Sequence, residues 1–419
     1  MMSMLIFFRK PLVFLFLVTF LLPIVVPSLA LGETFSPSEP EISAGSAVLI
    51  DADTAQVLWS KNSKEARAPA SLTKMMTAIV VLEKSDLKDP VTISEEAAAV
   101  GKSEIWLLAG EVLSVEDLLY AILLRSANDA AVALAEHVAG SEDRFVQLMN
   151  QKAREIGASQ TNFVNVTGLD AEKHLSTAYD LAVIARYAMQ NGTFAGIVAT
   201  DKWTISWAGH EDREIENLNP LLKDNAFITG VKTGYTEKAG WCLAASGTKD
   251  GKNLISIILE SENQDLRGED ALAVLNYGFN NFERKKIIDQ EVATFVFQTS
   301  DGTAPVKVAP QEDLGVLLPK DKKVTVTARY MLMQDISDPL SRGEKIGEIS
   351  LWMGDDLLGQ EDLVSPEQIS ETQQAERGKA TPEQRSASLS YPDYAVLAAF
   401  ALLLLLSILR LLRLALSGY

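Results

Sequence analysis

Two hairpin patterns that lie far apart in the chain constrain the fold more than any other feature of the sequence. Residues 46–60, SAVLIDADTAQVLWS, form two apolar runs around an Asp/Thr/Ala turn. Residues 240–261, GWCLAASGTKDGKNLISIILES, form two longer runs around Asp250-Gly251. An Asp-Gly pair between strand-like runs is the strongest short-range signal for a β-hairpin. With a helical middle between them, these hairpins predict an α+β fold in which an antiparallel sheet packs with helices.

The residues between the hairpins carry helix start and stop signals. Pro69 stands just before the apolar segment 71–84. Ser114 precedes VEDLLYAILLRS, with Asp117 in the capping-box position, and Gly140 ends NDAAVALAEHVAG as a C-terminal cap. We therefore predict consecutive helices in this region.

The pattern changes after residue 285. Short alternating runs such as VATFVF and VTVTARY predict a small all-β domain over residues 286–364. Residues 365–391 contain almost no large apolar side chains, so they cannot offset the entropy of ordering and are predicted to be a flexible stalk. The α+β domain is assigned to residues 31–285.

Apolar segments at both ends of the chain predict export and membrane attachment. Residues 1–30 have two basic residues, a long apolar stretch and a final Ser-Leu-Ala, which is typical of a secretory signal peptide. An uncleaved anchor is the alternative. Residues 394–409, YAVLAAFALLLLLSIL, are followed by two arginines and predict a membrane helix within 392–416, with an interfacial helix as the alternative.

The charge balance argues against nucleic acid as a partner. The chain has 56 acidic and 38 basic residues and a formal net charge of -18, and a phosphate backbone would be repelled by it. The lone cysteine, Cys242, cannot form an internal disulfide and is predicted to be a buried apolar side chain.

Three short motifs with chemically useful residues follow one another in the α+β domain. They are Ser71-x-x-Lys74, Ser126-x-Asn128 and Lys232-Thr233-Gly234. Ser71 and Lys74 share one face of a helix, so a hydroxyl and an amine can meet there. Each motif alone is weak, because Ser-x-x-Lys recurs at Ser85 and Lys88 and a Ser-x-Asn segment also serves as a helix cap.

Together and in this order, the motifs are those of class A β-lactamases and penicillin-binding proteins. Their context resembles the low-molecular-weight penicillin-binding proteins, the serine-type D-alanyl-D-alanine carboxypeptidases. The stretches that carry the resemblance cover residues 46 to about 285 and are APASLTKMMTA, LLYAILLRSANDAAVALAEHVAG, TNFVNVTGLD, LSTAYDLA, ITGVKTGYTEKAGWCLAAS and LRGEDALAVLNYGF.

The resemblance implies a β-lactamase/transpeptidase-like catalytic domain over residues 31–285. Its activity would be removal of the terminal D-alanine from peptidoglycan stem pentapeptides through a Ser71 acyl-enzyme, with no cofactor and no metal. β-Lactams would acylate the same serine as covalent inhibitors. The expected location is the extracytoplasmic face of the bacterial cytoplasmic membrane, in the periplasm or on the cell-wall side.

The residue types suit acyl transfer. A serine hydroxyl needs an adjacent base, and Lys74 can serve only as a neutral amine, which burial and a second cation such as Lys232 both promote. At a helix start, the Ser71 backbone N–H can stabilise an oxyanion. By resemblance, Ser126 and Asn128 relay the leaving-group proton and hold the substrate amide.

The resemblance also implies a substrate-binding set. It consists of Lys232, Thr233, Gly234, Tyr235 and Arg267. Tyr235 would provide the second oxyanion N–H, and it replaces the histidine that some relatives carry. The cations and Thr233 would recognise the free carboxylate of the terminal D-alanine.

Other functions remain as alternatives. A DD-endopeptidase uses the same chemistry, and a non-catalytic cell-wall scaffold could retain the fold. A class A β-lactamase is disfavoured because no Glu-x-x-x-Asn occurs between Asn128 and Lys232. The sequence has no Gly-x-Ser-x-Gly elbow, and the spacing of its three histidines suits no helical zinc pair, so we interpret them as surface or structural residues.

Overall fold

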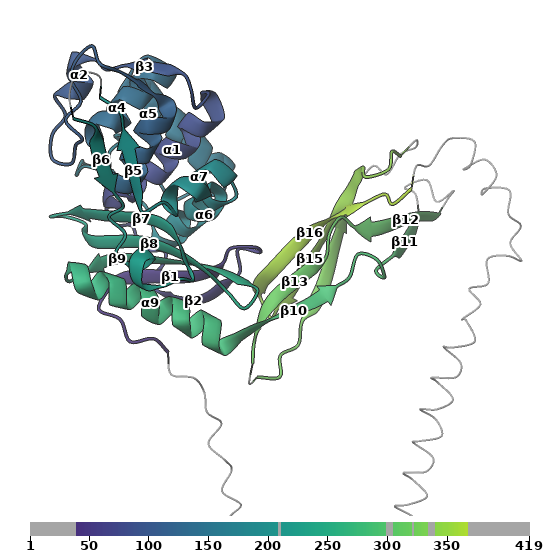
Figure 1. Cartoon of the computed structure of the whole chain (residues 1–419). Coiled ribbons are helices and arrows are strands. Elements are labelled where there is room, and N and C mark those ends of the chain that lie inside the picture. Colours follow the sequence, from purple (N-terminus) through teal and green to yellow (C-terminus); the bar gives the residue numbers. More distant parts are fainter. Residues whose placement is uncertain (1–38, 208–210, 299–304, 321, 334–339, 368–419) are drawn as a thin grey trace, which may run out of the picture. The chain divides into compact units, whose positions relative to one another are not determined.

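The computed structural model describes residues 39–207, 211–298, 305–320, 322–333 and 340–367 (Figure 1). The predicted signal peptide, most of the predicted stalk and the predicted C-terminal membrane helix lie outside the described residues. Within the described part, no helix combines the length and apolar character that crossing a membrane requires.

One antiparallel five-stranded sheet contains both predicted hairpins. Its strand order is β2-β1-β9-β8-β7. The strands are β1 (Ser46–Asp51), β2 (Val57–Lys61), β7 (Ile228–Thr236), β8 (Gly240–Lys249) and β9 (Lys252–Ser261). Strand β1 pairs with β2 on one side and with β9 on the other, so the two hairpins join directly. The predicted antiparallel sheet is confirmed.

Helices cover both faces of this sheet (Figure 1). On β1, Val48 and Ile50 belong to the large core shared with the helical part, whereas Ala47 and Leu49 pack with helix α9 (Gln264–Asn281) on the opposite face. Successive residues of a strand point to opposite faces. Because both faces are buried, the strand appears in the sequence as a continuous apolar run.

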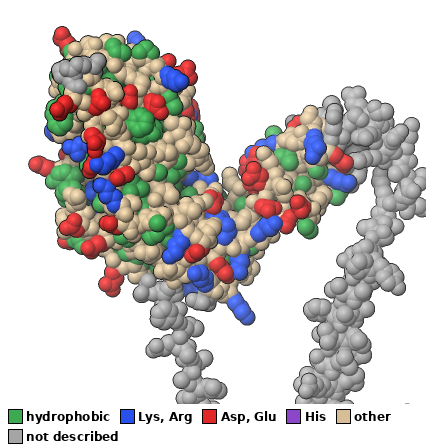
Figure 2. All heavy atoms as spheres, in the orientation of Figure 1, with side chains coloured by type: hydrophobic (Ala, Val, Ile, Leu, Met, Phe, Trp, Pro, Cys, Tyr) green, Lys and Arg blue, Asp and Glu red, His purple; other side chains and the backbone are tan. Residues whose placement is uncertain are grey.

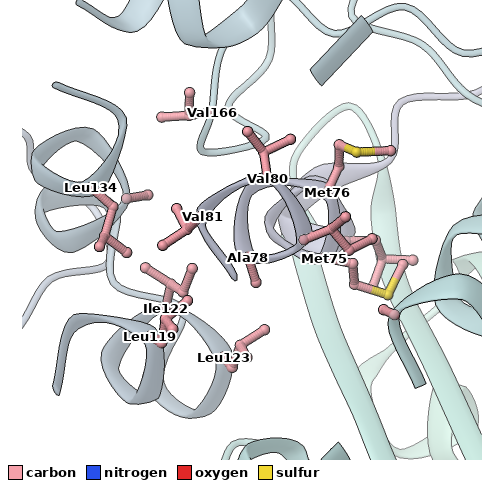
Figure 3. Packing of buried hydrophobic residues seen from close by; sticks show 14 of the residues in the cluster. Met75, Met76, Ala78, Val80, Val81, Leu119, Ile122, Leu123, Leu134 and Val166 are labelled. Carbon is pink, nitrogen blue, oxygen red and sulfur yellow. The ribbon is translucent and has the colours of Figure 1, made fainter. Parts of the chain in front are cut away.

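The helical part is built around α1 (Thr73–Lys84), whose first nine residues are all buried. Figure 3 shows Val81 of α1 on the side of Ile122 and Leu134, which come from neighbouring helical segments. A helix that is apolar all round belongs in a core. The other elements of this part are α2 (Glu95–Ala98), α3 (Val115–Tyr120), the π-helical turn η2 (Ala121–Arg125), α4 (Asn128–Ala139), α5 (Glu142–Glu155), α6 (Ala178–Met189), α7 (Gly192–Val198), α8 (Leu221–Asp224), and the strand pairs β3 (Pro90–Thr92) with β4 (Val112–Ser114) and β5 (Lys202–Ile205) with β6 (Arg213–Glu216).

The predicted helix ends are found with one difference. The Ser114 hydroxyl accepts the Asp117 N–H at the start of α3, and Gly140 ends α4 with a left-handed φ of 74°. The helix expected over 71–84 instead starts as a short 3-10 turn, η1 (Ala70–Leu72), and becomes α-helical at Thr73. Ser71 therefore lies in a tighter turn than a regular helix provides.

A second, all-β region follows. Its strands form a five-stranded sheet of order β11-β12-β16-β15-β14 and a separate pair, β10-β13. They are β10 (Phe282–Ile288), β11 (Phe295–Gln298), β12 (Pro305–Pro310), β13 (Leu314–Pro319), β14 (Thr327–Leu332), β15 (Lys345–Met353) and β16 (Asp356–Val364). Its own apolar core includes Val316, Ile349 and Leu351. The domain boundary that we predicted after residue 285 lies within the continuous strand β10.

Acidic and basic side chains are interspersed over the visible face of the described residues (Figure 2). This face therefore does not carry the broad basic surface with which proteins bind nucleic-acid backbones.

Candidate active site

The first motif places Ser71 and Lys74 in contact. Ser71 occupies the 3-10 turn η1, and Lys74 follows in the first turn of α1. The Lys74 Nζ lies 3.1 Å from the Ser71 Oγ. Ala70, directly before the serine, has a left-handed φ of 48°, an uncommon conformation for a residue with a side chain.

The Lys74 amine is enclosed and has two neutral acceptors. It donates to the Asn128 Oδ1 at 2.8 Å and to the Thr167 carbonyl oxygen at 2.6 Å. Burial, followed by the nearby charge of Lys232, lowers the pKa of Lys74 well below its usual value of 10.5. A neutral amine has two N–H groups and one lone pair, so these two acceptors leave the lone pair for the Ser71 hydroxyl.

The second motif forms the turn between η2 and α4. Ser126 adopts a left-handed φ of 65° at the end of η2, and Asn128 begins α4. The Asn128 Nδ2 donates to the Gly101 carbonyl oxygen at 2.9 Å, which directs its oxygen to Lys74. The buried Ser126 Oγ has no hydrogen-bond partner among the described residues, and is thus available to a substrate atom.

The third motif lies on β7, next to the serine turn. A Cβ atom added to Gly234 would lie 3.1 Å from the Ser71 backbone N and 3.1 Å from the Ala70 Cβ. Only glycine lets the strand pass this close to the Ser71 N–H without displacing it. The buried Lys232 amine donates to the Thr233 carbonyl oxygen at 3.0 Å.

A second cation accompanies Lys232. Burial and then the charge of Arg267, on α9, lower the pKa of Lys232 to about 7. The Arg267 guanidinium lies 5.3 Å from the centre of the Trp241 ring, and Trp241 in turn contacts the half-exposed ring of Tyr235 at 4.3 Å. The Arg267 Nε is buried without a partner among the described residues. The third motif is therefore linked to the serine turn by the contact of Gly234 and by the charge of Lys232 near Lys74. Arg267 and Tyr235 are linked to the same strand through the Lys232 charge and the Trp241 ring.

Sequence reasoning missed two supports of the site. One is the Thr167 carbonyl oxygen, which holds the Lys74 amine. The other is His174, whose Nε2 lies 2.9 Å from the Thr73 Oγ1, while Thr73 donates to the carbonyl oxygen of Ala70. The segments TNFVNVTGLD and LSTAYDLA were part of the resemblance, but a backbone carbonyl has no side-chain signal.

The His174 ring is fixed in one tautomer. Its Nδ1 accepts the Val164 N–H at 3.0 Å, so its Nε2 carries the proton and donates to Thr73. Burial lowers the pKa of His174 to about 4. His174 is therefore neutral and structural, as the sequence interpretation proposed, whereas His210 lies outside the described residues.

The site has the parts of a serine acyl-transfer enzyme with a lysine base. The site contains a serine at a helix start, a buried amine whose pKa is lowered, and a glycine-containing strand of the antiparallel sheet beside the serine N–H. No group of three or more His, Cys, Asp and Glu side chains in the described part of the chain could hold a metal ion. This combination defines an enzyme of the penicillin-binding type.

Comparisons with known proteins give the family. Residues 33–263 match the D-alanyl-D-alanine carboxypeptidase family, and residues 282–371 match the C-terminal domain of penicillin-binding protein 5. The chain therefore belongs to the D-alanyl-D-alanine carboxypeptidase family. The predicted family, activity class and α+β fold with a C-terminal all-β domain are confirmed.

Individual relatives cover most of the chain. The D-alanyl-D-alanine carboxypeptidase DacF of Bacillus subtilis is 33% identical over 339 residues, which are 79% of this chain and 87% of the relative. The corresponding values for DacD of Escherichia coli are 34% over 352 residues, 80% and 89%. The structure of penicillin-binding protein 5 from Haemophilus influenzae is similar with a TM-score of 0.66 at 30% identity, covering 80% of this chain and 99% of that one.

Proposed function

We propose that Ser71 is the nucleophile with which this enzyme removes the terminal D-alanine from peptidoglycan stem pentapeptides. The observation that carries the proposal is the contact between Ser71 and the buried Lys74 amine, whose two N–H groups have other acceptors. Lys74 takes the Ser71 proton as the hydroxyl oxygen attacks the carbonyl carbon of the D-Ala-D-Ala bond.

The other motif residues complete the acylation step. The backbone N–H groups of Ser71 and Tyr235 stabilise the oxyanion, and the unpartnered Ser126 hydroxyl passes a proton to the leaving amine. Asn128 holds the substrate amide. D-Alanine then leaves, and water hydrolyses the Ser71 ester with Lys74 again accepting a proton.

Recognition of a free carboxylate favours the carboxypeptidase over an endopeptidase. Lys232 and Arg267 are both buried cations without a carboxylate partner among the described residues. Buried charges are costly when unpaired. The free carboxylate of a substrate offsets the charges of Lys232 and Arg267. The Thr233 hydroxyl donates a further hydrogen bond to the same carboxylate.

The same reasoning extends to inhibitors and location. β-Lactams, whose ring amide and carboxylate mimic the substrate, acylate Ser71. Residues 1–30 direct export, and residues 392–416 anchor the enzyme at the extracytoplasmic face of the cytoplasmic membrane. The β-domain of residues 286–364 and the stalk of residues 365–391 then set the distance between the membrane and the active site.

Intact-mass measurement of the chain incubated with benzylpenicillin tests the proposal. We expect one persistent adduct, which is lost in the Ser71→Ala variant. The matched control is Ser85→Ala, because Ser85 belongs to another Ser-x-x-Lys pair of the chain, and this variant is expected to retain labelling. An adduct on folded Ser71→Ala protein refutes the nucleophile. A rapidly vanishing adduct with hydrolysed drug indicates a β-lactamase, and no adduct on any variant indicates a scaffold protein.

A further inference from the structure

We propose that Trp106 is a specificity-determining residue that contacts the acyl side of the substrate, the part that stays attached to Ser71 after D-alanine leaves. The inference rests on the proposed function and deepens it. Trp106 lies in the segment between α2 and β4, residues 99–111, which we call the Trp106 loop.

The Trp106 side chain is exposed where its neighbours are not. It is 65% exposed, whereas Ile105 and Leu107 on either side are 2% and 3% exposed. A tryptophan in an apolar sequence such as IWLL is expected in the core. Here the loop is anchored by its two neighbours, and the large indole is directed to solvent.

The backbone that directs the indole outward is strained and firmly held. Trp106 has a left-handed φ of 56°, which is a genuine outlier for a bulky residue and persists only where the surroundings enforce it. The Asp129 carboxylate accepts the N–H groups of Ile105 and Leu107, each at 3.1 Å. The Arg213 Nη2 donates to the Trp106 carbonyl oxygen at 3.2 Å.

Arg213 is itself fixed. Its guanidinium forms two hydrogen bonds to the Glu111 carboxylate at 2.5 and 2.8 Å, and both side chains are largely buried. It also lies 3.8 Å from the centre of the Trp207 ring. A bidentate, buried and stacked arginine is one of the most rigid supports that side chains can provide.

The Trp106 loop is attached to the catalytic motif. The Asn128 backbone N–H donates to the Ser103 carbonyl oxygen at 2.6 Å, and its side chain donates to that of Gly101. Asp129, the next residue, holds the loop on both sides of Trp106. The same two residues that begin α4 beside Lys74 therefore also fix the position of the indole.

This position suits the acyl side of the substrate. In the proposed function, the carboxylate of the leaving D-alanine is bound by Lys232, on strand β7 of the sheet, and by Arg267, on α9. The Trp106 loop instead lies in the helical part, where Figure 1 shows α2 and β3. It is hydrogen-bonded to the side-chain amide of Asn128. In the proposed mechanism this amide holds the substrate amide on the acyl side. A flat, exposed indole offers apolar contact to a side chain there, such as the methylene chain of a stem-peptide residue or the acyl group of a penicillin.

The acylation rate with two penicillins tests this inference. Benzylpenicillin carries an apolar phenylacetyl group on the acyl side, and 6-aminopenicillanic acid has the same nucleus without it. For Trp106→Ala in the full chain, we expect the second-order acylation rate with benzylpenicillin to fall about tenfold, and that with 6-aminopenicillanic acid to stay within about twofold. Trp106→Phe retains most of the benzylpenicillin rate. The matched control is Val112→Ala, because Val112 is a similarly exposed apolar residue directly after the Trp106 loop, and this variant leaves both rates unchanged.

The outcomes separate this inference from the proposed function. An equal fall with both compounds means that Trp106 acts only by supporting Asn128, and it overturns the inference. Unchanged rates for Trp106→Ala overturn it as well. If the unsubstituted chain is acylated by neither compound, the proposed function itself is contradicted and the inference falls with it.

Discussion

The proposed chemistry of this site requires Lys74 to be neutral while it keeps its hydrogen bonds. Lys74 is fully buried and contacts two neutral oxygens, from Asn128 and Thr167. The charge of Asp129 favours the protonated form of Lys74, but the Asp129 carboxylate is engaged by backbone N–H groups. Desolvation is therefore the main cause of the lowered Lys74 pKa, and it favours the neutral amine that the proposed mechanism uses as a base.

The two buried lysines predict a bell-shaped dependence of kcat/KM on pH. The acid limb reports protonation of Lys74, which disables the base. The alkaline limb reports Lys232, whose pKa of about 7 means that its charge is lost as the pH rises. Above that value, kcat/KM for a D-Ala-D-Ala peptide is expected to fall by about tenfold per pH unit.

A Lys232→Arg variant checks this assignment, because arginine stays charged throughout the range. We expect a lower maximal rate from the larger side chain, the same acid limb, and no alkaline limb near pH 7. The measurement is the pH profile of D-alanine release for both proteins. Persistence of the alkaline limb in the variant would show that another group controls it.

At the scale of elements, the site depends on the close approach of strand β7 to the turn η1. The approach is possible because Gly234 has no side chain, and the nearest atoms are the backbone N of Ser71 and the Cβ of Ala70, each 3.1 Å from an added Cβ. The added methyl group must displace the turn that carries Ser71, the proposed nucleophile, and its backbone N–H.

Gly234→Ala is therefore expected to slow acylation by benzylpenicillin about 10- to 100-fold, while lowering the free energy of unfolding by only about 1–2 kcal/mol. Acylation kinetics and thermal unfolding measure the two effects. The control is Gly196→Ala, because Gly196 lies in α7 and an added Cβ meets nothing within 4 Å. If Gly234→Ala is acylated as fast as the unsubstituted enzyme, the turn around Ser71 can move to accommodate the methyl group without impairing acylation.

The sequence predicted those elements whose signals are local. Asp250-Gly251, the Ser114 cap and the Gly140 stop each act through their own neighbours, and each is found. The 3-10 start at Ala70 was not predicted, because strand β7 and His174, which pack against this turn, come from distant segments.

The candidate site was predictable as a set of residue types and only partly as a structure. The motifs indicated Ser71, Lys74 and Asn128, which the structure brings into contact. The Thr167 and Gly101 contacts use carbonyl oxygens, which every residue has, so no sequence pattern could indicate them. The exposure of Trp106 was not predictable for a different reason. Its apolar neighbours in the sequence predict burial, whereas the backbone conformation at Trp106 turns the side chain outward.

At the scale of the whole molecule, the residues of the proposed site all come from the α+β domain, between Ser71 and Arg267. The all-β domain has its own core and ends in an ordered segment. The Ser365 carbonyl oxygen accepts the Gly343 N–H, and the Ser365 N–H donates to the carbonyl oxygen of Glu344. A cut placed after Glu367, the last described residue, therefore preserves these bonds and removes only residues 368–419.

This cut separates attachment from catalysis. Because residues 394–409 are the apolar segment proposed as the anchor, we expect the full chain to sediment with membranes and the shortened chain to appear in the soluble fraction of the extracytoplasmic compartment. Both are expected to react with benzylpenicillin at the same rate, because no site residue has been removed. The full chain with Ser71→Ala is the control, and it stays with the membrane although it cannot be labelled. If the shortened chain still sediments with membranes, attachment depends on residues 1–30 or on the folded domains, and the proposed C-terminal anchor is wrong.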